Sequence, residues 1–330
     1  MIDNPPTFHI PSLPDGEQIV AVSETHYTRV LDVLETAFPK TPRSFFYTIT
    51  RRDPAYRPDF SLAVVKDNRY LAHLQILDRT LLFDGQPLRV GGIGSVGTRP
   101  ECRGRGYATA LLNRATEIMD QEKMKASILF TGIHPFYERL GWKSVPQSEQ
   151  EIPVSALKNY RPPYYTYRRI RESDYPVLQE MYALRISPLT GPLLRTTDYW
   201  PARAGWMFHT GVALVEQETV TAYFYAAIYD ANQPIMTVTE FGYRQEDEAI
   251  LSRLLGAMAR KAEEMNCSIL RGFFYPDEAV RRFGQSQRLI AGEKEHPYLM
   301  WKDVGENRNE IQIHEAVAAH RFLYWPTDAF

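Results

Sequence analysis

The 330-residue sequence has few cysteines, no excess of charge and no long apolar run. Its two cysteines, Cys102 and Cys267, fit neither a disulfide framework nor a metal-ligand spacing. The formal net charge of -2 provides no positive field for nucleic acid or an anionic membrane. The N-terminal residues are acidic and proline-rich where a signal peptide needs a basic start and an apolar run, and no segment is long enough to span a membrane. These absences predict a cytoplasmic protein with no metal, no nucleic-acid partner and no membrane partner.

Two common glycine-rich phosphate sites are also missing. A P-loop requires Gly-Lys-Ser/Thr, so that a lysine reaches phosphate and a hydroxyl holds magnesium, and the sequence contains no such motif. Residues 92–97, Gly-Ile-Gly-Ser-Val-Gly, fit the letters of the dinucleotide fingerprint. That fingerprint must lead directly into a helix, whereas here Thr98, Arg99 and Pro100 follow. The sequence therefore argues against a P-loop and against nicotinamide or flavin binding.

The first half of the chain alternates between strand and helix periods. It predicts a strand and a helix in residues 17–38, three antiparallel strands in 60–98, a helix over 107–121, a buried strand at 125–131 and a short helix closed by Gly141.

The same order of elements recurs after the Pro-, Tyr- and Arg-rich stretch 159–169, which indicates a weak internal duplication. The predicted fold is α/β (α+β), with two tandem domains that each carry a mixed, mainly antiparallel sheet flanked by helices. We expect domains at 1–158 and 159–304, and a C-terminal tail at 305–330. Because the tail is rich in apolar side chains, we expect it to pack against the rest of the chain rather than extend into solvent.

The short loop Arg103-Gly104-Arg105-Gly106-Tyr107-Ala108 lies between a predicted strand and the 107–121 helix. Successive backbone N–H groups in a tight turn, together with the positive end of a helix, form a site for a pyrophosphate. The two glycines let the ligand approach the backbone, and the two arginines match its charge.

The motif Arg103-x-x-Gly106-x-Ala108, within this order of elements, resembles the GNAT (GCN5-related N-acetyltransferase) superfamily, in which this loop holds the pyrophosphate of acetyl-CoA. The preceding strands and the segment 136–142, Phe-Tyr-Glu-Arg-Leu-Gly-Trp, agree with it, and the match spans most of residues 17–150. The resemblance implies that Val96, Gly97 and Thr98 supply backbone contacts to the acetyl and pantetheine groups. It assigns the phosphates to Arg103, Gly104, Arg105, Gly106, Tyr107 and Ala108.

The tandem layout is similar to that of the enhanced intracellular survival acetyltransferases, whose second domain lacks the coenzyme loop. Here the corresponding residues 243–248 contain no glycine and three acids, which would repel phosphate. Too little sequence remains after the second repeat for their separate C-terminal domain. That departure leaves the substrate range and the oligomeric state, including a homo-oligomer, open.

Within this resemblance, Tyr137 matches the general acid that protonates the CoA thiolate. The resemblance to the enhanced intracellular survival acetyltransferases, in which the carboxylate of a terminal phenylalanine is the base, implies that the tail packs back on the first domain and makes the Phe330 carboxylate the candidate base. The alternative is a tail in which Trp325 and Phe330 only cover an apolar groove. His134 and His73 are rival bases because imidazole titrates near neutral pH, and Asp328 and Glu138 are weaker candidates. Cys102 is expected to be a loop residue, although its place beside a helix start favours a thiolate.

The reaction implied is direct acetyl transfer from acetyl-CoA to a primary amine, on a small molecule or a peptide. Nothing in the sequence selects the amine: Phe45, Phe46 and Tyr47 fit a core, a pocket wall or a surface loop equally well. A non-catalytic acyl-CoA sensor or scaffold is the alternative of another class. A single-stranded nucleic-acid binder is disfavoured by the near-neutral charge.

Overall fold

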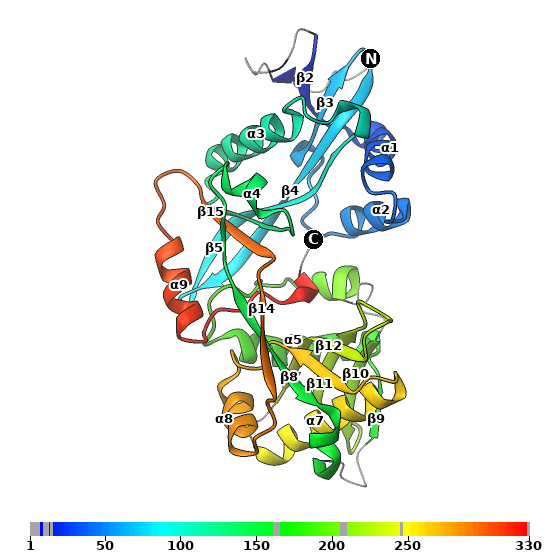
Figure 1. The fold of residues 1–330 in the computed structure, drawn as a ribbon, viewed down its shortest axis with the longest axis vertical. Coiled ribbons are helices and arrows are strands. Elements are labelled where there is room, and N and C mark those ends of the chain that lie inside the picture. Colours follow the sequence, from blue (N-terminus) through cyan, green and yellow to red (C-terminus); the bar gives the residue numbers. More distant parts are fainter. Residues whose placement is uncertain are drawn as a thin grey trace.

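The structure of this chain is a computed structural model, and it describes residues 7–8, 13, 16–160, 166–204, 210–244 and 247–328. The described strands form two sheets, one in the upper and one in the lower half of the molecule (Figure 1). The prediction of two mixed, mainly antiparallel sheets flanked by helices is confirmed. In each sheet, one pair of strands is parallel.

The first sheet has eight strands in the order β1-β2-β3-β4-β5-β6-β15-β7. Its centre is the antiparallel run β3 to β5, as the turn residues between the three predicted strands require. The bounds of the strands are β1 Thr7–Phe8, β2 Gln18–Ala21, β3 Ser61–Lys66, β4 Arg69–Phe83, β5 Gln86–Thr98, β6 Ala126–Phe130, β7 Lys143–Ser144 and β15 Leu299–Asp303.

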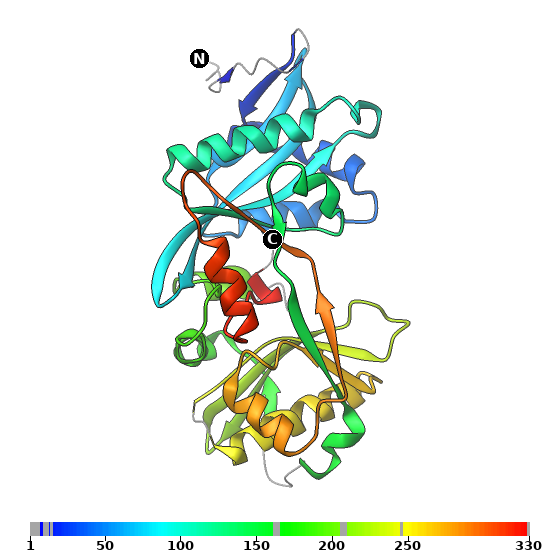
Figure 2. The ribbon, with the colours of Figure 1, turned by 60° about the vertical axis from the view of Figure 1, so that its left-hand side comes forward.

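Helices flank this sheet on both sides (Figures 1 and 2). Helix α3 (Tyr107–Gln121) buries Leu111, Ala115 and Met119 against one face, as their helical spacing predicts. Helices α1 (Tyr27–Ala37) and α2 (Arg43–Arg51) share a second apolar cluster. A short helix, α4 (His134–Glu138), follows β6 and ends before Gly141.

The second sheet has seven strands in the order β14-β8-β13-β12-β11-β10-β9. It repeats the plan of the first, since three antiparallel strands lead into a long helix and then a strand parallel to the third. The bounds are β8 Gln147–Pro153, β9 Thr166–Arg169, β10 Thr210–Glu216, β11 Thr219–Ala227, β12 Ile235–Tyr243, β13 Ile269–Gly272, β14 Gly292–His296, α5 Tyr175–Ile186, α7 Glu248–Glu264 and α8 Glu278–Ser286.

The two sheets exchange strands. Strand β8 precedes residue 158 but pairs with β13 and β14 in the second sheet. Strand β15 precedes residue 304 but lies between β6 and β7 in the first sheet. The chain therefore passes between the two halves more than once, and Figure 2 shows β8 and β14 running side by side along the molecule. The domain limits at 158 and 304 stay predictions, and they do not coincide with the sheets.

The C-terminal tail contacts both halves of the molecule. After α9 (Glu310–Ala318), Phe322 and Tyr324 join an apolar cluster with residues of the first sheet. Leu323 and Trp325 point into the core of the second half. Successive side chains thus point alternately to the first and the second half, as in an extended chain that is buried on both faces.

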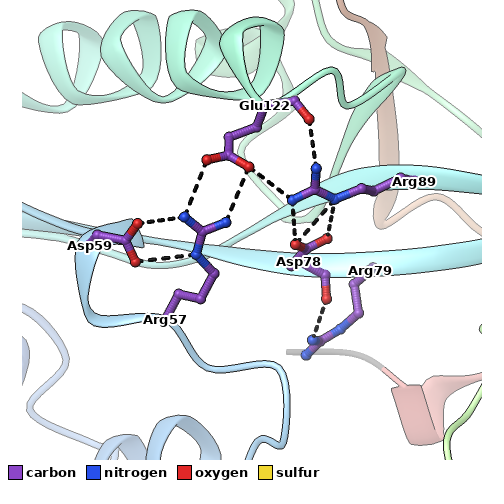
Figure 3. A network of polar contacts seen from close by, with 6 residues as sticks. All are labelled: Arg57, Asp59, Asp78, Arg79, Arg89 and Glu122. Carbon is purple, nitrogen blue, oxygen red and sulfur yellow. Dashed lines mark hydrogen bonds and ion pairs between the residues drawn. The ribbon is translucent and has the colours of Figure 1, made fainter.

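An ion-pair network fixes the end of α3 to the long β4–β5 hairpin (Figure 3). Arg89 of β5 binds the Asp78 carboxylate through Nε and Nη2, at 2.9 and 2.6 Å, and reaches Glu122 at 3.1 Å. Arg57 binds the same Glu122 at 3.1 Å and also binds Asp59. The groups are partly exposed, so the network adds orientation more than stability.

Candidate active site

The loop before α3 has the backbone of an anion-binding turn. Gly104 and Gly106 have φ of +77° and +81°, and Gly106 is the N-cap residue of the helix. Residues with a side chain rarely adopt this conformation, so the backbone favours glycine at both positions. A Cβ built on either glycine would meet no atom within 4 Å. The outer face of the loop is therefore open to a ligand.

Positive charge gathers on this open face. The first-turn N–H groups of α3, from Tyr107 to Thr109, have no acceptor within the helix, and the helix dipole adds positive potential there. The side chains of Arg103 and Arg105 are exposed beside them. Arg103 also donates from Nη2 to the Ala37 carbonyl at 3.3 Å, which ties the loop to the end of α1. This arrangement suits a diphosphate.

Tyr107 anchors the loop from below. Its ring is buried in the core under α3, and its hydroxyl donates to Oε1 of Glu17 at 2.5 Å. Lys66 lies 3.8 Å from the same oxygen. Tyr107 is predicted to bind the coenzyme, but its side chain packs in the core, so only its backbone can contact a ligand on the open face of the loop.

Strands β5 and β6 part beside the loop. They pair in parallel from Val90 with Ala126 to Ile93 with Leu129, and the register ends there. Beyond this point no described strand pairs with the β5 backbone on the side of β6. A cavity of about 430 Å³ occupies the opening. Its lining residues are Ala37, Phe38, Val96, Gly97, Thr98, Cys102, Arg103, Gly104, Arg105, Gly106, Tyr107, Ala108, Thr109, Ile133, Phe136 and Tyr137.

The cavity brings together Tyr137 and all nine residues for which a coenzyme-binding role is predicted. Phe330 lies outside the described residues. The sequence analysis did not find the apolar wall formed by Phe38, Ile133 and Phe136. No signal in the sequence marks Phe38, because it belongs to the wall only through the approach of α1 to β5.

Gly97 permits that approach. A Cβ at this position would lie 3.1 Å from both Ala37 Cβ and Leu34 Cδ2, and 3.3 Å from Phe38 Cε2. Such distances are shorter than ordinary van der Waals contacts. The glycine at 97 is thus explained by the packing of α1, not by its backbone conformation.

Tyr137 is buried in the wall of the cavity. Its ring is 7% exposed and packs edge-on against Phe136 and Trp142. Burial raises the pKa of its hydroxyl to about 12, so the group stays protonated at neutral pH. Among the described residues, its hydroxyl has no hydrogen-bond partner. The proton is thus available to a group in the cavity.

Of the rival bases, His73 is fully buried, and both of its ring nitrogens are hydrogen-bonded. Burial lowers its pKa to about 4, so it is neutral but has no ring nitrogen free to accept a proton from an amine. His134 uses Nε2 to contact the Thr131 carbonyl at 3.0 Å. Glu138 is exposed on the short helix after β6.

Asp328 belongs to a buried charge cluster between the tail and the second half. Arg195 approaches its Oδ1 at 2.9 Å and also binds Glu240, while Tyr199 donates to Asp328 at 2.8 Å. Burial raises the pKa of the Asp328 carboxyl, although Arg195 opposes the shift. These contacts make Asp328 an anchor of the tail.

In the second half, the N-terminus of α7 corresponds to the N-terminus of α3, but a side chain already caps it. The Asp247 carboxylate caps α7 and accepts from the Ile250 N–H at 2.6 Å. A side-chain carboxylate therefore occupies the place where the first half offers open N–H groups. Residues 245–246 of this loop lie outside the described residues.

A second cavity, of about 370 Å³, lies between the β4–β5 hairpin and residues 193–199. Its lining arginines are already ion-paired, Arg79 with the buried Asp53 and Arg89 with Asp78. Arg79 also donates to the Asp78 carbonyl (Figure 3). Paired arginines suit a phosphate less well than the exposed Arg103 and Arg105, so the first cavity is the better match to a coenzyme.

Over the described part of the chain, no three or more His, Cys, Asp or Glu side chains are arranged to hold a metal ion. No helix among those described has the length and apolar character needed to cross a membrane.

Comparison with known proteins agrees with this geometry. Residues 18–145 match the family model described as Acetyltransferase (GNAT) domain. None of the curated proteins matches the sequence. Among solved structures, a GCN5-related N-acetyltransferase from Kribbella flavida is similar with a TM-score of 0.68 and 18% identity, over 86% of this chain and 70% of that one.

Two further structures share the fold over most of the chain. Eis1 from Mycobacterium abscessus has a TM-score of 0.60 and 14% identity, over 87% of this chain and 73% of its own. N-myristoyltransferase from Saccharomyces cerevisiae, solved with bound myristoyl-CoA, has a TM-score of 0.58 and 12% identity, over 92% of this chain and 84% of its own. At these identities the similarity shows the fold, and both halves of the chain take part in it.

Proposed function

We propose that the protein transfers an acetyl group from acetyl-CoA to a primary amine, a proposal supported by the match of residues 18–145 to the GNAT acetyltransferase domain model. The observation that carries the proposal is the 430 Å³ cavity, which joins the open phosphate loop to Tyr137 along the free edge of β5. One end of this cavity suits a diphosphate and the other holds a proton donor. In a CoA thioester, the diphosphate and the reactive thioester lie at opposite ends of the pantetheine arm, so they would match the two ends of this cavity.

The residues of the loop would hold the coenzyme. First-turn N–H groups of α3 and the two exposed arginines would bind the pyrophosphate. The free edge of β5 would hydrogen-bond the pantetheine amides as an added strand does. Backbone N–H groups at Val96 to Thr98 would then meet the thioester oxygen, where negative charge develops during the reaction.

The transfer itself is direct. The neutral amine attacks the thioester carbon, the C–S bond breaks, and the leaving thiolate takes a proton from the Tyr137 hydroxyl. The nitrogen gives up its own proton to a base. We propose the terminal carboxylate of Phe330 as that base.

The base can be tested by extending the chain by one glycine after Phe330. This moves the terminal carboxylate by one residue and leaves Asp328 in place. We expect kcat to fall about 100-fold or more, as for loss of a general base, with unchanged acetyl-CoA affinity. Unchanged kcat would assign the base to another group.

Calorimetric titration of acetyl-CoA tests the coenzyme site. Wild-type protein should bind one acetyl-CoA per chain, and Gly106→Glu should abolish binding, because it puts a carboxylate on the open face of the loop. Gly85→Glu is the matched control: Gly85 has φ +74° and open space around it, but it lies in the β4–β5 turn outside the cavity. The control carries the same strain and charge, so it should bind normally.

Two outcomes decide the proposal. Binding that survives Gly106→Glu would place the coenzyme elsewhere, and no binding to wild type would overturn the proposal. Titration of myristoyl-CoA alongside acetyl-CoA tests which acyl-chain length the site binds, and we expect it to bind the short acetyl chain. A screen of small-molecule and peptide amines, followed by release of free CoA thiol, then identifies the acceptor.

A further inference from the structure

A β-bulge lies in β5 where the strand enters the cavity. The register with β4 pairs His73 with Gly97 but Gln75 with Gly94, so Ser95 and Val96 together stand opposite Leu74. Ser95 has φ +52°, a left-handed conformation that is uncommon outside glycine. Bulges of this kind redirect the side chains and backbone groups that follow them.

The bulge changes which residues face the cavity. Ile93, before the bulge, packs into the core beneath α3, and Val96, three residues later, packs against the same core. In a regular strand the residues on one face are two positions apart, so 93 and 95 would share it. The bulge therefore turns Val96 toward the cavity and Gly97 toward α1. In a regular strand, residues 96–98 would each point to the opposite face of the sheet.

His73 holds this bulge from the neighbouring strand. Its Nδ1 lies 3.0 Å from the Ser95 carbonyl oxygen, which can only accept, so Nδ1 carries the hydrogen. Its Nε2 then accepts from the Ser61 hydroxyl of β3 at 2.9 Å. His73 is 1% exposed and Ser61 is fully buried. The three strands are thus linked by two buried hydrogen bonds through one imidazole.

Burial gives this link its stiffness. The pKa of His73 is lowered to about 4, so the ring stays neutral and in one tautomer at physiological pH. A buried imidazole whose two nitrogens both have partners has no alternative contact with water. The hydrogen bond from Nδ1–H to the Ser95 carbonyl is therefore kept over the whole physiological pH range.

We propose that His73 is a positioning residue, an inference that rests on the proposed acetyl transfer. Its Nδ1–H binds the Ser95 carbonyl, and this contact orients the Val96–Thr98 backbone toward the thioester. It does not touch the coenzyme, because it is absent from the cavity wall. Its effect on the reaction is therefore through Ser95.

Two variants separate the two bonds of the ring. In His73→Asn, the amide nitrogen takes about the place of Nδ1 and can still donate to the Ser95 carbonyl. In His73→Gln, the amide lies near the place of Nε2, so the contact to Ser61 can persist while the bond to Ser95 is lost. Neither side chain is basic, so a rescue by asparagine also excludes a role for His73 as a base.

Turnover and coenzyme affinity are the first readouts. We expect kcat of His73→Gln to fall about 100-fold, the usual effect of losing one donor to a developing oxyanion, while its Kd for acetyl-CoA changes less than about threefold. His73→Asn should keep kcat within about fivefold of wild type. Equal loss in both variants, or no loss in either, would overturn the proposal.

Amide hydrogen exchange over residues 90–98 is a readout that requires no turnover. Exchange in this segment should rise in His73→Gln and stay near wild type in His73→Asn, and equal exchange in the three proteins would overturn the proposal. If wild type bound acetyl-CoA but acetylated no amine, the proposed function would fail while the exchange still tested the hold on the bulge. Should His73→Gln not fold, Ser61→Ala is the second variant: it leaves the Nδ1–H bond to the Ser95 carbonyl in place. Exchange in the same segment should then stay near wild type, and a clear rise would overturn the proposal.

Discussion

Tyr137→Phe removes a single oxygen atom from the cavity and is the sharpest test of catalysis. The edge-on contacts of the ring, with centroids 4.9 Å from Phe136 and 6.2 Å from Trp142, do not depend on the hydroxyl. No described residue hydrogen-bonds that hydroxyl. The free energy of unfolding should therefore change by less than about 1 kcal/mol, since no protein hydrogen bond is lost.

The expected effect on turnover is much larger. With a pKa of about 12, the hydroxyl is almost fully protonated at pH 7 and can supply the proton that the departing thiolate takes. Loss of a general acid lowers the rate by about 10² to 10⁴, which corresponds to about 3–5 kcal/mol of transition-state stabilisation. Acetyl-CoA affinity, set mainly by the phosphate loop, should stay within about threefold of wild type.

The assay is the release of free CoA thiol under saturating acetyl-CoA and amine, with calorimetry and thermal unfolding on the same samples. Tyr70→Phe is the matched control. Tyr70 is also buried, burial also raises its pKa, and it lies outside the cavity wall. A Tyr137→Phe variant that turns over as fast as Tyr70→Phe would refute the reasoning. Coenzyme binding without turnover in wild type would favour the sensor or scaffold.

Three further substitutions test the packing and the buried charges. Gly97→Val should cost about 1–3 kcal/mol by urea unfolding, because its side chain would crowd Leu34 and force α1 outward; a smaller loss would show that α1 yields freely. Arg195→Met should cost about 3–5 kcal/mol, since it removes the guanidinium that Glu240 and Asp328 share in the interior, and a loss below about 1 kcal/mol would contradict this. Burial raises the folded pKa of Asp328, so the stability it contributes is complete below its unfolded pKa and is lost as the pH rises through the folded value. Urea unfolding at a series of pH values should accordingly show the Asp328→Asn variant becoming more stable relative to wild type as the pH rises above about 4, the unfolded pKa of aspartate, and the reverse trend would contradict the shift.

Local patterns in the sequence predicted the first half well. The helix expected over 107–121 is α3, and the three strands expected in 60–98 are β3 to β5. Both depend on periodicity and turn residues within one segment. For Phe45, Phe46 and Tyr47 the sequence analysis does not decide between core, pocket wall and surface loop, yet these residues belong to α2, in which Phe46, Ile49 and Thr50 are buried at helical spacing. That signal was present in the sequence.

Partners distant in sequence could not be predicted. A strand pattern at 299–303 does not reveal that its neighbours are Ala126–Phe130 and Lys143–Ser144. Likewise, His73 was considered only as a base, because a single histidine in a strand carries no sign of the bulge opposite it. The nine residues predicted to bind the coenzyme lie in one loop and the end of the strand before it, so a local motif could identify them, whereas the place of Phe38 in the cavity wall depends on how α1 docks.

The strand exchange has a consequence for synthesis of the protein. In the first sheet, β7 is paired with β15 and not with β6, so residues 143–144 have no strand to join until residues 299–303 leave the ribosome. At about 5–20 residues per second, the sheet edge beside α4 stays unfinished for about 8–30 s. During that interval β6 presents an unpaired edge to other chains. We therefore expect that a fragment ending near residue 158, made alone, aggregates rather than folds into a working half.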